Sequence, residues 1–335
     1  MIAAAMARST DAPDGAPVTL RRRALLAALA AAACAPRVEP AGPALHPPKD
    51  AGDALVMADG ARLPLSAWRP EGEPRGVVLA LHGFNDYRGA FEIPAPLFTG
   101  AGWALYAYDQ RGFGGAPGRG IWPGRDTLAA DATAAATLIR ARHPGLPLIL
   151  LGESMGGAVL ILAATGDDPP PADGYILSAP AVWGGETMGR TGRWFLDLFA
   201  HTVPALGIVG GSPAIRASDN EAALIAMARD PMVLRSTRID ALWGLVGLMD
   251  AALEASARFD APALILYGDR DDIVPPRAIA ALKARLPGLA AGRQSFISYA
   301  GGHHLLLRDQ GRARVAEDIL AWAGNGALAA ARRAA

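Results

Sequence analysis

The chain has 335 residues, of which 51% are hydrophobic and 19% are charged, and its 32 basic residues balance its 32 acidic ones. This length suffices for one large α/β domain with an insertion, and the balanced charge excludes the overall basic field with which many proteins bind nucleic acid. The single cysteine, Cys34, excludes an internal disulfide and a cysteine-based metal cluster. Any ligand or partner must therefore be recognised by a local site.

Residues 1–34 have the features of a bacterial export signal in their usual order. Arginines at 21–23 precede an apolar run rich in alanine and leucine, and small residues lead up to Cys34. The run is about ten residues long, too short for a mature membrane-spanning helix of ~20 residues. The pattern resembles a lipoprotein signal in which Cys34 becomes the lipidated first residue, and its arginines also resemble a twin-arginine signal. An alanine-rich N-terminus with an unmodified cysteine is the alternative.

Two segments precede the main pattern of strands and helices. Residues 35–51 hold five prolines among small residues, a composition that stays extended and cannot bury a core, so we expect a tether. Residues 54–57 and 62–68 are apolar stretches on either side of the turn Ala58-Asp59-Gly60, which predicts an opening hairpin. The folded domain is therefore expected to begin near residue 52.

From residue 76 onward, apolar runs of strand length alternate with longer helical patterns. Such alternation predicts parallel strands joined by crossover helices and buried on both faces. We therefore expect an α/β fold, a mostly parallel sheet flanked by helices, formed by residues 52–180 and 259–324, with a C-terminal tail at 325–335. The expected strands are 76–81, 104–108, 146–151, 174–177, 263–267 and 294–299, and the expected helices are 126–143, 156–165, 276–286 and 312–323.

Residues 181–258 interrupt this alternation, because no strand pattern is convincing there while apolar helical stretches accumulate. We expect an inserted helical cap. Two runs, 193–199 and 242–249, are too apolar for solvated surface helices, and three interpretations stay open: packing against the core, lining of an acyl-binding pocket, and contact with a membrane. As a set they favour a lid. The substrate-binding candidates in it are Trp183, Trp194, Phe195 and Trp243.

The pentapeptide Gly152-Glu153-Ser154-Met155-Gly156 matches the Gly-x-Ser-x-Gly pattern of a nucleophilic serine. The string alone is weak evidence, since a chain this rich in glycine contains ~0.14 copies by chance. Its context is stronger, because a strand-like run ends directly before it and a helical run follows. A serine on this strand–turn–helix presents its hydroxyl above the sheet, next to a helix N-terminus that favours negative charge. We predict Ser154 as a catalytic nucleophile, with a purely structural glycine turn as the alternative.

Two backbone N–H groups are expected to bind the oxyanion of an acyl-transfer intermediate. Met155 follows the nucleophile and supplies the first by its position. Phe84, in the loop after the expected strand 76–81, is the natural source of the second. Because only the backbone is required, either side chain could serve packing alone.

The general base is expected last in the chain order of serine, acid and histidine. Only His303 and His304 satisfy this order, on the turn Gly301-Gly302 after the last expected strand. Neighbouring residues point in different directions, so one of them is expected to face Ser154 and the other to support it or face solvent. The histidines that the order excludes are His46, His82, His143 and His201.

The acid is expected after the strand at 263–267. Three carboxylates compete there: Asp269, Asp271 and Asp272. One must orient the imidazole and stabilise its cation, and the others are then turn or ion-pair residues. The chain order does not choose among them.

Together these motifs resemble the monoacylglycerol lipase and lysophospholipase group of α/β-hydrolases, also classed with serine aminopeptidase-like hydrolases. The resemblance covers about residues 55 to 323 and selects Asp271 as the acid and His304 as the base. It also implies that Asp109, Arg111 and Gly112 shape a structural loop beneath the serine. The segments that carry it are His82-Gly83-Phe84, residues 108–114, residues 152–157, Gly268–Pro275 and Tyr299–Asp309.

The resemblance and the residues together predict a serine hydrolase that cleaves a small lipid-like carboxylic ester through an acyl-enzyme. A peptidase or an acyltransferase with the same triad is the close alternative, and a non-catalytic lipid-binding module is a more distant one. No cofactor, metal, nucleic acid or obligate protein partner is implied. We expect export, to the periplasmic face of a bacterial membrane if Cys34 is lipidated and otherwise to the periplasm or the medium.

Overall fold

A computed structural model describes residues 35–184, 189–209 and 215–324. In this part of the chain nine strands form one sheet, in the order β1-β2-β3-β5-β4-β6-β7-β10-β11. The six strands from β5 to β11 in that order are parallel, and the first three extend the sheet by antiparallel pairing. The strands are β1 (Lys49–Asp50), β2 (Ala54–Val56), β3 (Arg62–Trp68), β4 (Gly76–Leu81), β5 (Trp103–Tyr108), β6 (Leu148–Glu153), β7 (Gly174–Ser178), β10 (Ala263–Gly268) and β11 (Gln294–Tyr299).

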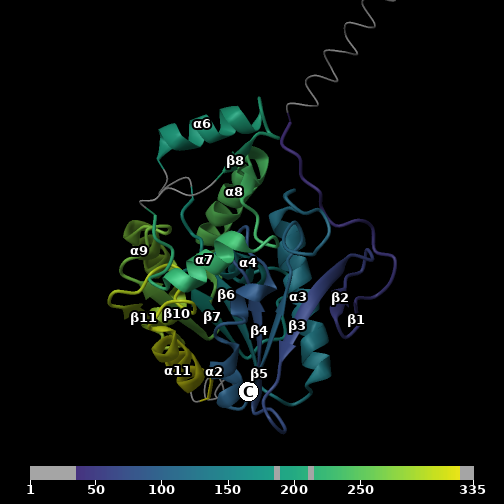
Figure 1. Cartoon of the computed structure of the whole chain (residues 1–335), viewed down its shortest axis with the longest axis vertical. Helices are drawn as coiled ribbons and strands as arrows, with labels where there is room; N and C mark the ends of the chain where they lie inside the picture. The colour runs from purple at the N-terminus through teal and green to yellow at the C-terminus, as the bar shows by residue number, and fades with distance from the viewer. Residues whose placement is uncertain (1–34, 185–188, 210–214, 325–335) are drawn as a thin grey trace, which may run out of the picture.

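Helices cover both faces of this sheet (Figure 1). Successive residues of β4 point to opposite faces, so Val77 and Leu79 join one core while Val78 and Ala80 join the other. Burial on both faces is the reason that the parallel strands are apolar at almost every position. The first core also holds side chains of α3 (Arg125–Arg142), α4 (Met155–Ala164), α8 (Ile239–Ala255) and α9 (Pro276–Arg285), and the second holds side chains of α2 (Ala95–Gly100) and α11 (Arg312–Trp322).

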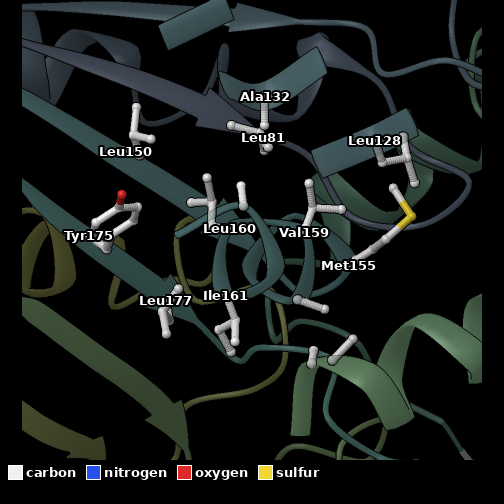
Figure 2. Close-up of a cluster of buried hydrophobic side chains, with 14 of the residues drawn as sticks. Leu81, Leu128, Ala132, Leu150, Met155, Val159, Leu160, Ile161, Tyr175 and Leu177 are labelled. Carbon is white, nitrogen blue, oxygen red and sulfur yellow. The ribbon is translucent and has the colours of Figure 1, made fainter. Parts of the chain in front are cut away.

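Helix α4 is buried along most of its surface, and this requires cover beyond the sheet. Its residues Val159, Leu160 and Ile161 are successive and all fully buried. A helix that is apolar all round needs apolar neighbours on its outer side as well. Helices α3 and α8 supply them, and Figure 2 shows Met155 of α4 and Leu128 of α3 within this cluster.

The predicted α/β architecture is confirmed. Each of the six strands and four helices expected from residue 76 onward is present, with ends within two residues of the expected ones. The opening hairpin is present as well, with β2 and β3 paired antiparallel. The carboxyl ends of the parallel strands therefore lie along one edge of the sheet, where the loops that carry the predicted site residues meet.

Residues 35–51 are extended, as expected for their composition, and they lie along the surface of the domain. The N–H of Glu39 donates to the carbonyl of Trp122 (2.8 Å), and the N–H of Leu45 donates to that of Ala58 (2.7 Å). The segment ends in β1, which pairs with β2. This docking, and the strand, were not predicted, because a proline-rich composition indicates an extended backbone but not where it lies.

The segment expected as a cap contains two kinds of structure. Helix α8 packs against α4 and α3, so core packing is the correct interpretation of residues 242–249. Helix α6 (Arg190–Ala200) lies at one end of the molecule, beyond α8 (Figure 1). The segment also has helix α7 (Glu221–Arg229) and a small antiparallel ribbon that was not predicted, formed by β8 (Gly207–Val209) and β9 (Ser236–Arg238).

The remaining elements are short, namely the 3-10 turns η1 (Arg88–Phe91) and η2 (Ser256–Arg258) and helix α10 (Pro287–Ala290). Among the described residues, no helix combines the length and the hydropathy needed to cross a bilayer. Cys34 and the rest of the predicted export signal lie outside the described residues.

Candidate active site

Ser154 occupies a sharp turn at the carboxyl edge of the sheet. Strand β6 ends one residue before it and α4 begins one residue after it. Its backbone, at φ 53° and ψ −112°, is strained for any residue with a side chain. Two glycines make the turn possible, because a Cβ on Gly152 would collide with the backbone of Gly156, and one on Gly156 with the carbonyl of Leu81. The strand–turn–helix context predicted for Ser154 is therefore present.

Strand β7 holds this turn in place. The N–H of Ser154 donates to the carbonyl of Ser178 (2.9 Å), and the carbonyl of Ser154 accepts from the N–H of Ala181 (2.9 Å). Backbone strain persists only where the surrounding structure enforces it, and these two bonds do so. The serine side chain remains partly exposed.

The predicted oxyanion donors, Phe84 and Met155, belong to two segments near Ser154. Met155 is the first residue of α4, and the first N–H groups of a helix have no acceptor within it. Phe84 lies in the loop after β4, whose backbone approaches Ser154: a Cβ built on Gly83 would lie 3.4 Å from the Cβ of Ser154. The ring of Phe84 packs edge-on against Phe113, with centroids 5.4 Å apart. The side chain of Phe84 therefore packs against Phe113, and the N–H of Phe84 belongs to a loop beside Ser154.

His82 anchors the start of this loop in its neutral form. Its Nδ1–H donates to the carbonyl of Gly83 (2.8 Å), while its Nε2 accepts from the N–H of Gln110 (3.0 Å). The imidazole is fully buried, and this burial lowers its pKa. His82 is therefore a structural residue, in agreement with its exclusion as the base.

His304 and Asp271 form a buried pair. The Nδ1 of His304 lies 2.8 Å from the Oδ2 of Asp271. The other oxygen of Asp271 accepts from the N–H groups of Ile273 and Val274, both at 2.8 Å, which fixes the carboxylate in its loop. A carboxylate on Nδ1 leaves Nε2 as the nitrogen that can exchange a proton with a nucleophile.

The competing acids and the second histidine have other partners. Asp269 accepts from the N–H of Gly301 (2.7 Å), and Asp272 accepts from the N–H of Arg216 (3.0 Å). The Nδ1 of His303 lies 3.6 Å from Asp309, and its backbone N–H donates to the same carboxylate (2.7 Å). The pair chosen from the family resemblance is thus the one that lies in direct contact.

Three loops converge on this edge of the sheet through one arginine that was not predicted. Arg308, four residues after His304, contacts Asp86 of the loop after β4 (2.7 Å) and Glu153 directly before Ser154 (2.5 Å). The sequence offered one signal, the closeness of this arginine to His304, but not its partners. Arg308 therefore links the turn of Ser154 to the loop of His304.

A second buried arginine, Arg111, joins the hairpin turn after β2 to helix α3, and the family resemblance implied a structural role for it. Arg111 contacts Asp59 of the hairpin turn (2.6 and 2.9 Å) and Asp131 of α3 (2.6 and 3.1 Å). Burial raises the pKa of Asp131 to about 6 although Arg111 opposes the rise, while Arg111 lowers the pKa of the more exposed Asp59. Nearby, Asp109 accepts from the N–H of Gly115 (2.7 Å). Asp59 and Asp131 bind Arg111, and Asp109 binds a backbone N–H, so all three carboxylates have a structural role.

One group among the described residues has the spacing of metal ligands. Asp219, His303 and Asp309 each place one ligand atom within 4.8 Å of the others. Hydrogen bonds already engage both carboxylates: Asp309 accepts from the Ser218 hydroxyl (2.6 Å) and Asp219 from the N–H of Gln310 (2.7 Å). A hydrogen-bond network explains the group without an ion.

The four substrate-binding candidates of the cap lie in different surroundings. Trp183 is half-buried against the main core. Trp194 and Phe195, on α6, are 59% and 48% exposed. Trp243, on α8, is half-buried and its Nε1–H donates to Asp197 of α6 (3.1 Å). The rings of Trp194 and Phe195 lie edge-on, with centroids 5.0 Å apart, and the contact of the four residues with substrate stays a prediction.

The chain matches the family described as serine aminopeptidase, S33 (Hydrolase_4), over residues 72–311. Monoacylglycerol lipase of Mycolicibacterium smegmatis is 27% identical over 276 residues, covering 78% of this chain and 93% of that protein. Human monoglyceride lipase is 26% identical over 259 residues, covering 76% of this chain and 84% of that protein. The solved structure of Paleococcus ferrophilus monoacylglycerol lipase is similar in fold, with a TM-score of 0.61 at 24% identity over 78% of this chain and 98% of that one.

The family match includes the loop of Phe84, the turn of Ser154, the loop of Asp271 and the loop of His304, all of which meet at one edge of the sheet. The chain therefore belongs to the serine aminopeptidase S33 family, as an α/β-hydrolase of the monoacylglycerol lipase and lysophospholipase type in the class of carboxylic-ester hydrolases.

Proposed function

We propose that the chain hydrolyses monoacylglycerol, lysophospholipid or similar lipid esters through an acyl-enzyme on Ser154. The observation that carries this proposal is the 2.8 Å contact between His304 and Asp271, at the edge of the sheet that holds the strained Ser154 turn. The monoacylglycerol and monoglyceride lipases to which the chain is similar over three quarters of its length support the substrate class.

In the proposed reaction, the hydroxyl of Ser154 attacks the ester carbonyl while Nε2 of His304 takes its proton. Asp271 holds the imidazole in the required tautomer and stabilises its cation. The N–H groups of Phe84 and Met155 bind the oxyanion of the tetrahedral intermediate. His304 then protonates the leaving alcohol, and a water molecule, activated by the same imidazole, releases the fatty acid from Ser154.

The first test asks whether Ser154 is a nucleophile. A fluorophosphonate probe should label the wild type and not Ser154→Ala, and the variant should lose turnover of a glyceride by about 10⁴-fold or more. Product analysis with monoacylglycerol, with an added alcohol and with an aminoacyl amide separates hydrolysis from acyl transfer and from peptidase activity. A folded wild type that is not labelled would contradict the proposal and favour a lipid-binding module.

The second test separates the three aspartates. Asp271→Asn keeps an oxygen for the N–H groups of its loop but offers an amide to His304, so we expect kcat to fall by about 10³–10⁴-fold. Asp269→Asn and Asp272→Asn are matched controls, because their amide oxygens can still accept the backbone bonds of the parent carboxylates, and they should keep most turnover. The reverse ranking would overturn the assignment of the acid.

We further propose that the protein is exported and held at a membrane through a lipid on Cys34. Besides the signal pattern, the exposed apolar face of α6 supports this: its residues 194, 195, 198 and 199 fall within about 140° of the helix circumference. The N–H of Arg37 bonds Asp240 at the start of α8 (3.1 Å), and the N–H of Asp240 bonds Pro204, just after α6 (3.1 Å). The described part of the chain therefore begins beside the start of α8 and the segment that follows α6.

Mass spectrometry of the mature protein tests the anchor. A lipidated N-terminal residue at Cys34, lost in Cys34→Ser together with membrane association in cells, is the expected result. An unprocessed N-terminus in an exporting host would contradict it.

A further inference from the structure

Arg308 has a buried guanidinium with two carboxylate partners, one in the loop after β4 and one at the end of β6. Its side chain is 7% exposed, and it contacts Asp86 (2.7 Å) and Glu153 (2.5 Å). Asp86 is 9% exposed and Glu153 is 1% exposed, so water screens this network weakly. The sulfur of Met227 on α7 lies 3.6 Å from the same guanidinium.

Each partner belongs to a segment that carries a proposed catalytic group. Glu153 is the last residue of β6, directly before Ser154. Asp86 lies two residues after Phe84, in the proposed oxyanion loop, and accepts from the N–H of Tyr87 (2.9 Å). Arg308 itself follows His304 by four residues, and its N–H bonds the intervening turn at Leu305 (2.8 Å). One side chain therefore joins the three segments on which the proposed chemistry depends.

The positive charge of Arg308 also affects the electrostatics of this cluster. Burial raises the pKa of Glu153, the neighbouring Asp86 adds to the rise, and Arg308 opposes it. Without the guanidinium, two buried carboxylates would repel each other and disfavour an oxyanion forming beside them. With it, the cluster has one net negative charge, which also favours a transient imidazolium on His304, a group that interacts electrostatically with Glu153.

We propose that Arg308 is a positioning residue for ester hydrolysis, which holds the oxyanion loop, the nucleophile turn and the histidine loop in register by binding Asp86 and Glu153 together. This role rests on the proposed function. It predicts that loss of Arg308 affects the chemical step more than substrate binding, because the reacting groups are displaced relative to one another while the cap is unchanged.

Arg111 provides a matched control. It is also a buried arginine, 8% exposed, that binds two carboxylates, but its partners are Asp59 and Asp131, which lie in the hairpin turn and on α3. Loss of either arginine leaves two carboxylates whose side chains are each less than 10% exposed, and should destabilise the fold by a similar amount. Only loss of Arg308 separates segments that carry reacting groups.

The experiment compares Arg308→Met, Arg308→Lys and Arg111→Met with the wild type on a soluble short-chain ester. Turnover is normalised to folded protein measured by circular dichroism. We expect Arg308→Met to lower kcat by about 10²–10³-fold and to leave KM within about 3-fold of the wild-type value. Arg308→Lys should have a kcat at least about tenfold higher than that of Arg308→Met. Arg111→Met should keep kcat within about 3-fold of the wild-type value. Fluorophosphonate labelling should slow in parallel with kcat.

Equal losses of kcat in Arg308→Met and Arg111→Met, or an unchanged kcat in Arg308→Met, would overturn the positioning role. If Arg308→Met does not fold, Asp86→Asn, which keeps the side-chain shape and removes one ion pair, takes its place; a fall in kcat with unchanged KM supports the role, and a change in KM alone contradicts it. A wild type that neither hydrolyses the ester nor reacts with the probe removes the proposed function, and this role with it.

Discussion

Helices α6 and α8 lie in the same stretch between β7 and β10, and both are rich in large apolar side chains, yet their surroundings are opposite. Leu248 of α8 is fully buried, whereas Leu198 of α6 is 40% exposed. Helix α8 covers α4 and belongs to the main core, while α6 lies beyond α8 with one apolar face outward. Apolar composition thus serves stability in one helix and leaves a surface for an apolar partner in the other.

The largest expected effect concerns stability, through a matched pair of substitutions. Leu248→Ala removes a buried side chain and leaves a cavity, so the free energy of unfolding should fall by about 2–5 kcal/mol. Leu198→Ala removes an exposed one and should cost less than about 0.5 kcal/mol. Urea unfolding followed by circular dichroism measures both. Similar losses for the two leucines would mean that α6 is as much a part of the core as α8.

The second-largest expected effect concerns the binding of the protein to lipid vesicles. The double variant Trp194→Ser, Phe195→Ser removes two aromatic rings from the outward face of α6 and should weaken binding to phosphatidylcholine vesicles by about tenfold or more. Turnover of a soluble short-chain ester should stay near that of the wild type. Leu45→Ser is the control, because Leu45 is also an exposed apolar residue but lies in the segment 35–51 and not on α6. Equal vesicle binding by all three proteins would contradict the proposed membrane face.

The smallest effect tests the link between the two helices. Trp243 of α8 donates its Nε1–H to Asp197 of α6 (3.1 Å), and its ring lies edge-on to His201, with centroids 5.6 Å apart. Trp243→Phe keeps most of the ring contact and loses the hydrogen bond, so global stability should change by no more than about 1 kcal/mol. Amide hydrogen exchange should become faster in α6 and not in α8. Unchanged exchange in α6 would show that other contacts hold the helix.

The sequence predicted the parallel core well, because each buried strand is a continuous apolar run bounded by glycine, proline or polar residues. It did not separate α8 from α6, since both runs have the composition of a buried helix and only the placement of α4 decides which one is covered. The short strands β8 and β9 were missed for a similar reason: each has three residues, and they pair only after the chain between them has folded.

The candidate site was predictable where chemistry imposes a chain order, and less so where it depends on contacts. The glycines around Ser154 and the aspartates after β10 were visible as patterns, while the choice of Asp271 and His304 came from the family resemblance. The structure adds that these two side chains are in contact. The bridge from Arg308 to Glu153, 155 residues apart along the chain, left no periodic or compositional signal.

The docking of residues 35–51 has a consequence for how substrate would be reached. Cys34 precedes Arg37, the residue bonded to Asp240, by only three positions, a span of about 10 Å at full extension. A lipid on Cys34 would then allow little rotation and almost no distance between the catalytic domain and the bilayer. Encounters with lipid esters would depend on lateral diffusion within the leaflet rather than on capture from solution, and the local surface density of substrate, rather than its bulk concentration, would set the rate.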